Sequence, residues 1–134
     1  MRPVLLDTDT LSAVMRQNPA ATAQAQTYLS VYRQFTLSII TRYEILRGLR
    51  TKGATAQLAA FERFCAANQV LPITDEIIVR ASEIYADLYR EGALIGDADI
   101  LIAASALVHD LALATNNEGH FRRIAGLRVE NWLK

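Results

Sequence analysis

Short apolar runs that alternate with longer helical patterns limit this chain to a narrow choice of folds. The runs span 3–7 (PVLLD), 35–40 (FTLSII), 70–73 (VLPI), 111–115 (LALAT) and 127–131 (LRVEN). Because each run is short and is followed by turn or polar residues, we predict a strand at each. Strands that alternate with helices through short links favour helices on both faces of a mostly parallel sheet. The sequence therefore predicts an α/β fold, a three-layer α/β/α sandwich.

The segments between these runs carry helical signals. We expect helices over 8–16, 19–32, 54–68 and 97–109, and the last of these is apolar almost all round, as in a core helix. Another helix should begin at Thr41, with Glu44 at the spacing of a capping box, and end or break at Gly48 or Gly53. A long amphipathic helix should begin at Thr74 or Asp75, and its predicted apolar stripe comprises Ile78, Ala81, Ile84, Tyr85 and Leu88.

The composition excludes several classes of protein. The chain has 134 residues, of which 51% are hydrophobic, so we expect one domain over residues 1–134 with its own core. It has 14 basic and 14 acidic residues, which argues against coating nucleic acid by bulk electrostatics but allows a local basic groove. The single cysteine, Cys65, cannot form an internal disulfide, and no apolar stretch reaches the roughly 20 residues of a membrane span. We therefore expect a cytoplasmic protein with no membrane partner.

Acidic and amide side chains stand at the ends of the apolar elements. Asp7 ends the first run, Asp99 lies at the start of the last helix, and Asn116 and Asn117 follow the fourth run. The carboxyl ends of parallel strands meet at one edge of a sheet, where ligands bind in such folds. Several carboxylates gathered there need a counter-ion, and oxygen ligands select a hard cation such as Mg²⁺ or Mn²⁺. Together with Glu44, these residues suggest a metal-dependent nuclease, in which the cation activates water and relieves charge on a phosphate.

Each acidic residue also has a purely structural explanation. Asp7 and Asp9 could cap the first helix, and Glu44 could belong only to a capping box. Asp97 and Asp99 could cap the helix that they open, and for Asp97 we favour the capping role. Capping and metal binding are compatible, so the sequence leaves both roles open for the other residues.

Four segments together resemble the PIN-domain ribonucleases, and most closely the VapC toxins of bacterial toxin–antitoxin modules. They are LLDTDTL at 5–11, TRYEILRG at 41–48, GDADILIAA at 96–104 and ATNNEGHFRRIAGLRVENW at 114–132. The likeness runs from end to end of the chain, and it implies a single PIN domain over residues 1–134. It also implies Mg²⁺-dependent endonucleolytic cleavage of RNA, with catalytic and metal-binding roles for Asp7, Glu44 and Asp99.

The chain departs from this family at the fourth acidic position. Many relatives carry an aspartate there, whereas this sequence has Asn117, between Asn116 and Glu118. An amide oxygen can ligate a metal but brings no negative charge. We therefore expect Asn117 to complete the catalytic set, and the free protein to bind its metal weakly. Asp97, Thr115, Asn116 and Glu118 are the further candidates for supporting the site.

The expected substrate and partners follow mainly from the resemblance. It implies RNA as the substrate, a homodimer, and a small VapB-like antitoxin that covers the active site. Four arginines could give the acidic centre a basic border suited to RNA phosphates, although each could equally be a solvated helix residue. These residues are Arg16, Arg42, Arg47 and Arg50.

Two other functions remain open from the sequence. One is a PIN-fold nuclease that acts in RNA processing or on DNA without an antitoxin. The other is a catalytically silent module that binds RNA or protein, which the missing fourth acid favours. A small gene directly upstream that encodes a DNA-binding antitoxin would favour the toxin. Tyr43 and Phe121 could each stack a base, but we expect both in the core.

Overall fold

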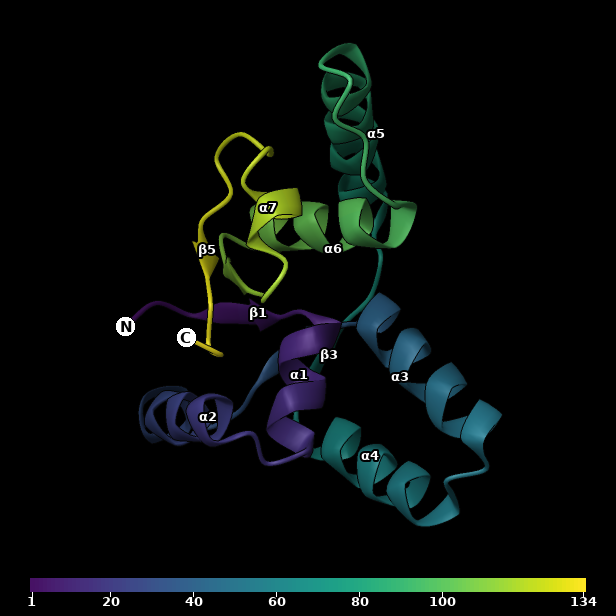
Figure 1. Cartoon of the computed structure of the whole chain (residues 1–134). Coiled ribbons are helices and arrows are strands. Elements are labelled where there is room, and N and C mark those ends of the chain that lie inside the picture. The colour runs from purple at the N-terminus through teal and green to yellow at the C-terminus, as the bar shows by residue number, and fades with distance from the viewer.

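Five parallel strands form the central sheet of the computed structural model, which describes all residues from 1 to 134 (Figure 1). Their order across the sheet is β3-β2-β1-β4-β5, and every neighbouring pair is parallel. The expected parallel sheet is thus confirmed, and the carboxyl ends of the strands share one edge. The strands are β1 (Val4–Leu6), β2 (Thr36–Ser38), β3 (Gln69–Leu71), β4 (Ala112–Ala114) and β5 (Val129–Glu130).

Seven helices surround the sheet. Figure 1 shows α5 and α6 on one side of β1 and α1, α2 and α4 on the other, which confirms the three-layer sandwich. None of the helices combines the length and the apolar character that crossing a membrane requires. The helices are α1 (Thr8–Met15), α2 (Pro19–Tyr32), α3 (Ile39–Lys52), α4 (Thr55–Ala67), α5 (Asp75–Arg90), α6 (Asp97–Val108) and α7 (Glu118–Phe121).

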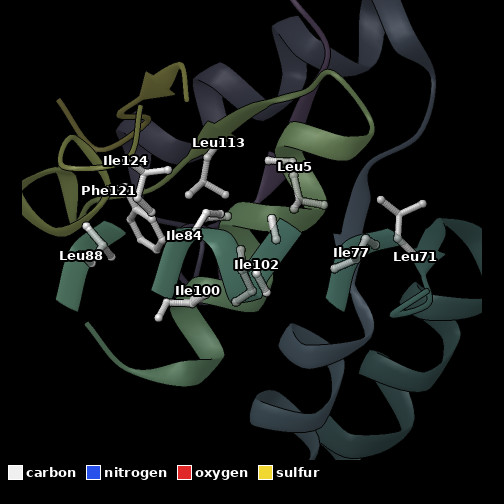
Figure 2. Close-up of a cluster of buried hydrophobic side chains, with 14 residues drawn as sticks. Leu5, Leu71, Ile77, Ile84, Leu88, Ile100, Ile102, Leu113, Phe121 and Ile124 are labelled. Carbon is white, nitrogen blue, oxygen red and sulfur yellow. The ribbon is translucent and has the colours of Figure 1, made fainter. Parts of the chain in front are cut away.

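The strands divide the core in two because successive side chains point to opposite faces of a sheet. Leu5 and Leu113 face the α5–α6 side, where they pack with Ile84, Ile102 and others in a cluster of 14 buried residues (Figure 2). On the other side of the sheet lies a second cluster of 12 buried residues, which includes Phe61 and Trp132. The strand residues in this cluster are Val4, Leu6, Leu37, Ala112 and Ala114. Both faces of the sheet are therefore covered, and its polar residues are confined to the strand ends.

The start of α3 differs from the expected capping box. Strand β2 ends at Ser38, whose hydroxyl accepts a hydrogen bond from the backbone N–H of Ile40, so the helix begins at Ile39. The prediction that FTLSII is a strand to residue 40 and that Thr41 caps the helix is wrong. Two β-branched residues open the helix here because the polar Ser38 supplies the cap. α3 continues through Gly48 and ends at Gly53, which adopts a left-handed φ of 65°.

The buried stripe of α5 also differs from the expected one. Ile77, Ala81, Ile84 and Leu88 are buried, whereas Ile78 is 48% exposed and Tyr85 is 45% exposed. The prediction is therefore confirmed for Ala81, Ile84 and Leu88 and wrong for Ile78 and Tyr85. Ile77 and Ile78 fit the periodicity almost equally well, and only packing against α6 distinguishes them. The short helix α7 was not predicted at all.

Candidate active site

Asp7 lies at the carboxyl end of β1 and is the most buried acidic side chain, at 5% exposure. Its Oδ1 accepts a hydrogen bond from the backbone N–H of Thr8 (2.8 Å), so it caps α1. Its Oδ2 accepts a hydrogen bond from the hydroxyl of Thr115 (2.8 Å), the residue that follows β4. The hydrogen bonds tie Asp7 between two neighbouring strand ends, but no cation lies among its partners.

The environment of Asp7 opposes its negative charge. Burial raises the pKa of this carboxyl from 3.8 to about 7, and the Asp9 carboxylate and, to a smaller extent, Asp99 add to the rise. The hydrogen bonds from Thr115 and Thr8 act in the opposite direction without cancelling the effect. A buried carboxylate with other carboxylates nearby is costly unless a cation compensates it.

Glu44 reaches the same edge from the second turn of α3. Its Oε1 accepts a short hydrogen bond from the Thr8 hydroxyl (2.6 Å), which also lies 3.1 Å from the Thr41 hydroxyl. Glu44 therefore bonds to α1 rather than to its own helix terminus, so the capping-box interpretation of this residue is wrong. Thr8 fixes the carboxylate, since a hydroxyl held between two oxygens has little freedom to turn.

Asp99 enters the site from the first turn of α6. Its Oδ2 lies 3.6 Å from Nδ1 of His120, and that nitrogen lies 2.9 Å from the side-chain nitrogen of Asn117. Burial raises the pKa of Asp99, His120 opposes that rise, and the Glu44 and Asp9 carboxylates add to it. Asp99 therefore interacts electrostatically with both Asp7 and Glu44.

His120 is the site residue that the sequence interpretation missed. The available signal was that His120 stands three residues after Asn117, a spacing that brings two side chains to the same side of a helical turn.

The Thr115–Asn117 segment is fixed to the site mainly by its backbone. The N–H of Asn116 donates to Asp9 Oδ2 (3.1 Å), and the N–H of Asn117 donates to the Thr115 hydroxyl (3.0 Å). The Asn116 side chain turns to Asn131, which donates to its Oδ1 (3.1 Å). Thr115 thus supports Asp7 directly, whereas Asn116 contacts the site through its backbone N–H rather than through its side-chain amide.

Glu118 points away from the carboxylates. It pairs with Arg122 and with the Lys134 ammonium (2.9 Å), and it accepts a hydrogen bond from Asn131 (2.8 Å). The contacts with Lys134, Asn131 and Arg122 lower its pKa to about 2. In this arrangement Glu118 holds the C-terminal segment and does not replace the missing fourth acid.

Asp97 and the four arginines have different positions from one another. Gly96 occupies the N-cap of α6 and no side chain caps the helix, so the expected capping role of Asp97 is wrong.

The four arginines lie at different distances from the site. Arg42 pairs with Glu62 of α4. Arg47 lies 3.9 Å from Glu44, closest to the site. Arg16 and Arg50 are exposed, and Arg16 lines a groove of about 370 Å³ that begins at Thr8 and Glu44.

The donor set fits a hard divalent cation in its chemistry and its charge. Asp7, Glu44 and Asp99 supply carboxylate oxygens, and a cation would stabilise the charged forms of Asp7 and Asp99, whose pKa is raised mainly by burial and further by neighbouring carboxylates. As the side chains stand, no three acidic, histidine or cysteine residues lie close enough to enclose one ion. Binding would therefore need the carboxylates to draw together, at a cost in affinity.

Comparison with known proteins identifies the family of this chain. The PIN domain family model matches residues 4–127. The chain is 31% identical over 133 residues to the tRNA(fMet)-specific endonuclease VapC of Salmonella typhimurium. The alignment covers 98% of this chain and 99% of that protein. It is 36% identical over 95 residues to ribonuclease VapC1 of Methanocaldococcus jannaschii, which covers 69% and 68%. The crystal structure of DNA-bound VapBC from Salmonella typhimurium is similar with a TM-score of 0.86 at 29% identity, over 98% and 99% of the two chains.

These matches define first a class and then a group within it. The PIN domain model matches most of the chain, the full-length relatives are VapC proteins, and a VapBC structure shares the fold. The chain belongs to the PIN-domain family and, within it, to the VapC ribonucleases. The resemblance inferred from the four sequence segments is confirmed.

Proposed function

We propose that the protein is the endoribonuclease toxin of a type II toxin–antitoxin module and that it cleaves RNA with the help of Mg²⁺ or Mn²⁺. As a VapC protein it is an endoribonuclease. The observation that supports the cation best is the buried Asp7, whose charge no basic side chain compensates. Asp7, Glu44 and Asp99 would hold the cation, which supplies an activated water and charge relief on the phosphate. A cytoplasmic location stays a prediction from the sequence.

The protein's own side chains have distinct tasks in this proposal. Thr115 orients Asp7 through a hydrogen bond, and Thr8 does the same for Glu44. Asn117 can offer an amide oxygen at the fourth position if its side chain turns from His120. His120 lies beside Asp99 and can hold or deliver a proton to an oxygen in the site.

The test is cleavage of purified RNA by the purified protein, with Mg²⁺, with Mn²⁺ and with EDTA. We expect discrete fragments with either cation, none with EDTA, and none from Asp99→Asn. The matched control is Asp87→Asn on α5, which removes an exposed carboxylate far from the site and should cleave as the wild type does. Cleavage that persists in EDTA or in Asp99→Asn would refute the proposed metal site.

A metal readout that is independent of cleavage completes this test. A ligand that binds only the folded state raises the melting temperature, by an amount that grows with its concentration. Added Mn²⁺ should raise the melting temperature of the wild type and leave that of Asp99→Asn unchanged. Because Asn117 brings no charge, we expect half of the rise to need millimolar rather than micromolar Mn²⁺.

The antitoxin belongs to the same proposal. The groove that begins at Thr8 and Glu44 passes between α1, α3 and α4, with apolar walls that include Met15 and Leu49. It suits an extended or helical segment that lays apolar side chains along the groove and brings a basic side chain to Glu44. Co-expression with the product of the gene upstream tests this, because capture of a stable complex should restore growth that the toxin alone arrests.

The α5 surface supports the expected homodimer. Ile78, Val79, Tyr85 and Tyr89 are each 45% to 65% exposed on this one helix, and the two tyrosine rings stack with centroids 6.4 Å apart. An exposed apolar stripe of this size is typical of a protein contact, and a second copy can supply the same stripe by two-fold symmetry. Tyr85→Arg should convert a dimer to a monomer in light scattering, and an unchanged mass would refute this choice of face.

A further inference from the structure

Tyr43 is exposed next to the proposed catalytic site. It precedes Glu44 in α3 and is 59% exposed, although the sequence suggested a core position. That expectation is wrong because Thr41 and Ile45 are the residues of this turn that face inward. A tyrosine that the fold leaves in solvent beside a substrate site is available to bind something.

Arg47 joins Tyr43 to the site. Its guanidinium carbon lies 5.1 Å from the centre of the Tyr43 ring, and its Nη2 lies 3.9 Å from Glu44 Oε2. Aromatic ring, cation and carboxylate thus form a continuous chain along one helix. The guanidinium lies over one face of the ring, while Tyr43 as a whole remains largely exposed.

The surface of Tyr43 and Arg47 is separate from the groove assigned above to the antitoxin. That groove is lined from α3 by Glu44, Ile45, Gly48, Leu49 and Lys52, and neither Tyr43 nor Arg47 contributes to it. Glu44 therefore has the groove on one side and the tyrosine–arginine pair on the other. Arg50 continues the pair one turn further, since positions 43, 47 and 50 share one helix face.

We propose that Tyr43 and Arg47 form a platform for one unpaired RNA base next to the cleaved bond. The base stacks on the open face of the Tyr43 ring, and the neighbouring phosphate pairs with Arg47. An aromatic ring with cations along one face is the arrangement that binds single-stranded nucleic acid, and stacking accepts any base. The two positive charges on this face favour a phosphate-bearing ligand over a basic protein segment. This inference rests on the proposed function only in taking RNA as the substrate.

The experiment measures RNA binding without cleavage. The probe is a fluorescein-labelled RNA hairpin with an all-adenosine loop, added in EDTA to the Asp99→Asn protein, and the readout is fluorescence anisotropy. Tyr43→Ala should weaken binding about tenfold, whereas Tyr43→Phe, which keeps the ring, should stay within about twofold. Val31→Ala on α2 is the control for an exposed apolar side chain elsewhere, and it should bind as the parent does.

A second arm identifies the contact itself. The loop adenosines are replaced one at a time by an abasic nucleotide. One replacement should weaken RNA binding by the parent protein by the same factor of roughly ten. The same replacement should leave the affinity of Tyr43→Ala unchanged, because the stacking partner is already absent.

Several results would overturn the platform. One is that Tyr43→Ala binds the RNA as tightly as its parent does. Another is that Tyr43→Ala and Tyr43→Phe lose the same affinity. A third is that the abasic replacement weakens binding by Tyr43→Ala as much as it weakens binding by the parent. A changed molecular mass of Tyr43→Ala in light scattering would assign this surface to a protein partner instead. Failure of the proposed function looks different, because the wild type would then cut no RNA with Mg²⁺. A wild type that cuts RNA while Tyr43→Ala binds normally would refute the platform alone.

Discussion

Replacing Asp7 by asparagine should stabilise the metal-free protein, and increasingly so as the pH rises. The folded state raises the pKa of this carboxyl from 3.8 to about 7, mainly through burial and then through Asp9. Folding therefore favours the protonated form of Asp7. The stability that protonated Asp7 contributes is fully present below a pH of about 3.8 and is lost as the pH rises towards 7. Asparagine has nearly the same shape and no proton to lose.

The size of the effect follows from the same shift. Each pKa unit corresponds to about 1.4 kcal/mol, so complete ionisation of Asp7 costs the wild type about 4 kcal/mol. Between about pH 5 and pH 8 the cost grows by roughly 2 to 3 kcal/mol. The amide has only one acceptor oxygen, so the hydrogen bond from either Thr8 or Thr115 is lost or reversed, and this subtracts about 1 kcal/mol or more from the gain. The pH dependence of the difference is therefore more informative than the difference itself.

The assay is urea unfolding of wild type and Asp7→Asn in EDTA at about pH 5 and about pH 8. We expect the variant's advantage in free energy of unfolding to increase by roughly 2 to 3 kcal/mol between the two conditions. Asp110→Asn is the control, because its parent side chain is 92% exposed, and its difference from wild type should stay constant. A variant that is never more stable, or whose advantage is the same at both pH values, would refute the argument from burial and repulsion.

Two further predictions test the scaffold around the site. Gly48 lies inside α3 with no atom within 4 Å of the position that a Cβ would take, so Gly48→Ala should raise the free energy of unfolding by roughly 0.5 to 1 kcal/mol in urea. A loss of stability would mean that this position is more crowded than its surroundings suggest. Lys134, Asn131 and Arg122 hold the pKa of Glu118 at about 2, below its usual 4.5, so this carboxylate stabilises the fold above about pH 4.5. In thermal melts the melting temperature of the wild type should fall as the pH falls towards 2. Glu118→Gln should have a lower melting temperature than the wild type near neutrality and should lose less of it on acidification. If the melting temperatures of the two proteins fell in parallel with pH, the assignment would be contradicted.

The sequence predicted best those features that depend on local patterns and on strand direction. Asp7 and Thr115 end neighbouring parallel strands, and any fold of this class brings their side chains to the same edge. Asp99 was predicted equally well, because its place at the start of an apolar helix fixes where the carboxylate emerges. The five strands and six of the seven helices were predicted for the same reason, apart from shifted ends.

What the sequence could not decide were choices between nearly equivalent positions. Ser38 and Thr41 are both good N-caps, and only the end of the pairing with β3 selects Ser38. Glu44 fits a capping box, yet the hydroxyl of Thr8, 36 residues away in the chain, is a partner that no local pattern reveals. Tyr43 looked like a core residue because burial depends on the rotation of α3 about its axis. In each case a contact between distant segments decided the outcome.

The carboxylate cluster also makes a joint prediction for the metal and the antitoxin. Charge repulsion at Asp7 and Asp99 is relieved by any cation that reaches the site, whether a metal ion or a basic side chain of the antitoxin. Two ligands that relieve the same repulsion gain less together than apart, and each must weaken the other by the same factor. We therefore expect added Mn²⁺ to weaken the equilibrium affinity of the antitoxin for the wild-type toxin in surface plasmon resonance. In Asp7→Asn, where part of the repulsion is absent, the effect of Mn²⁺ on this affinity should shrink. Equal affinities with and without Mn²⁺ would mean that the antitoxin is held elsewhere and leaves the carboxylates free.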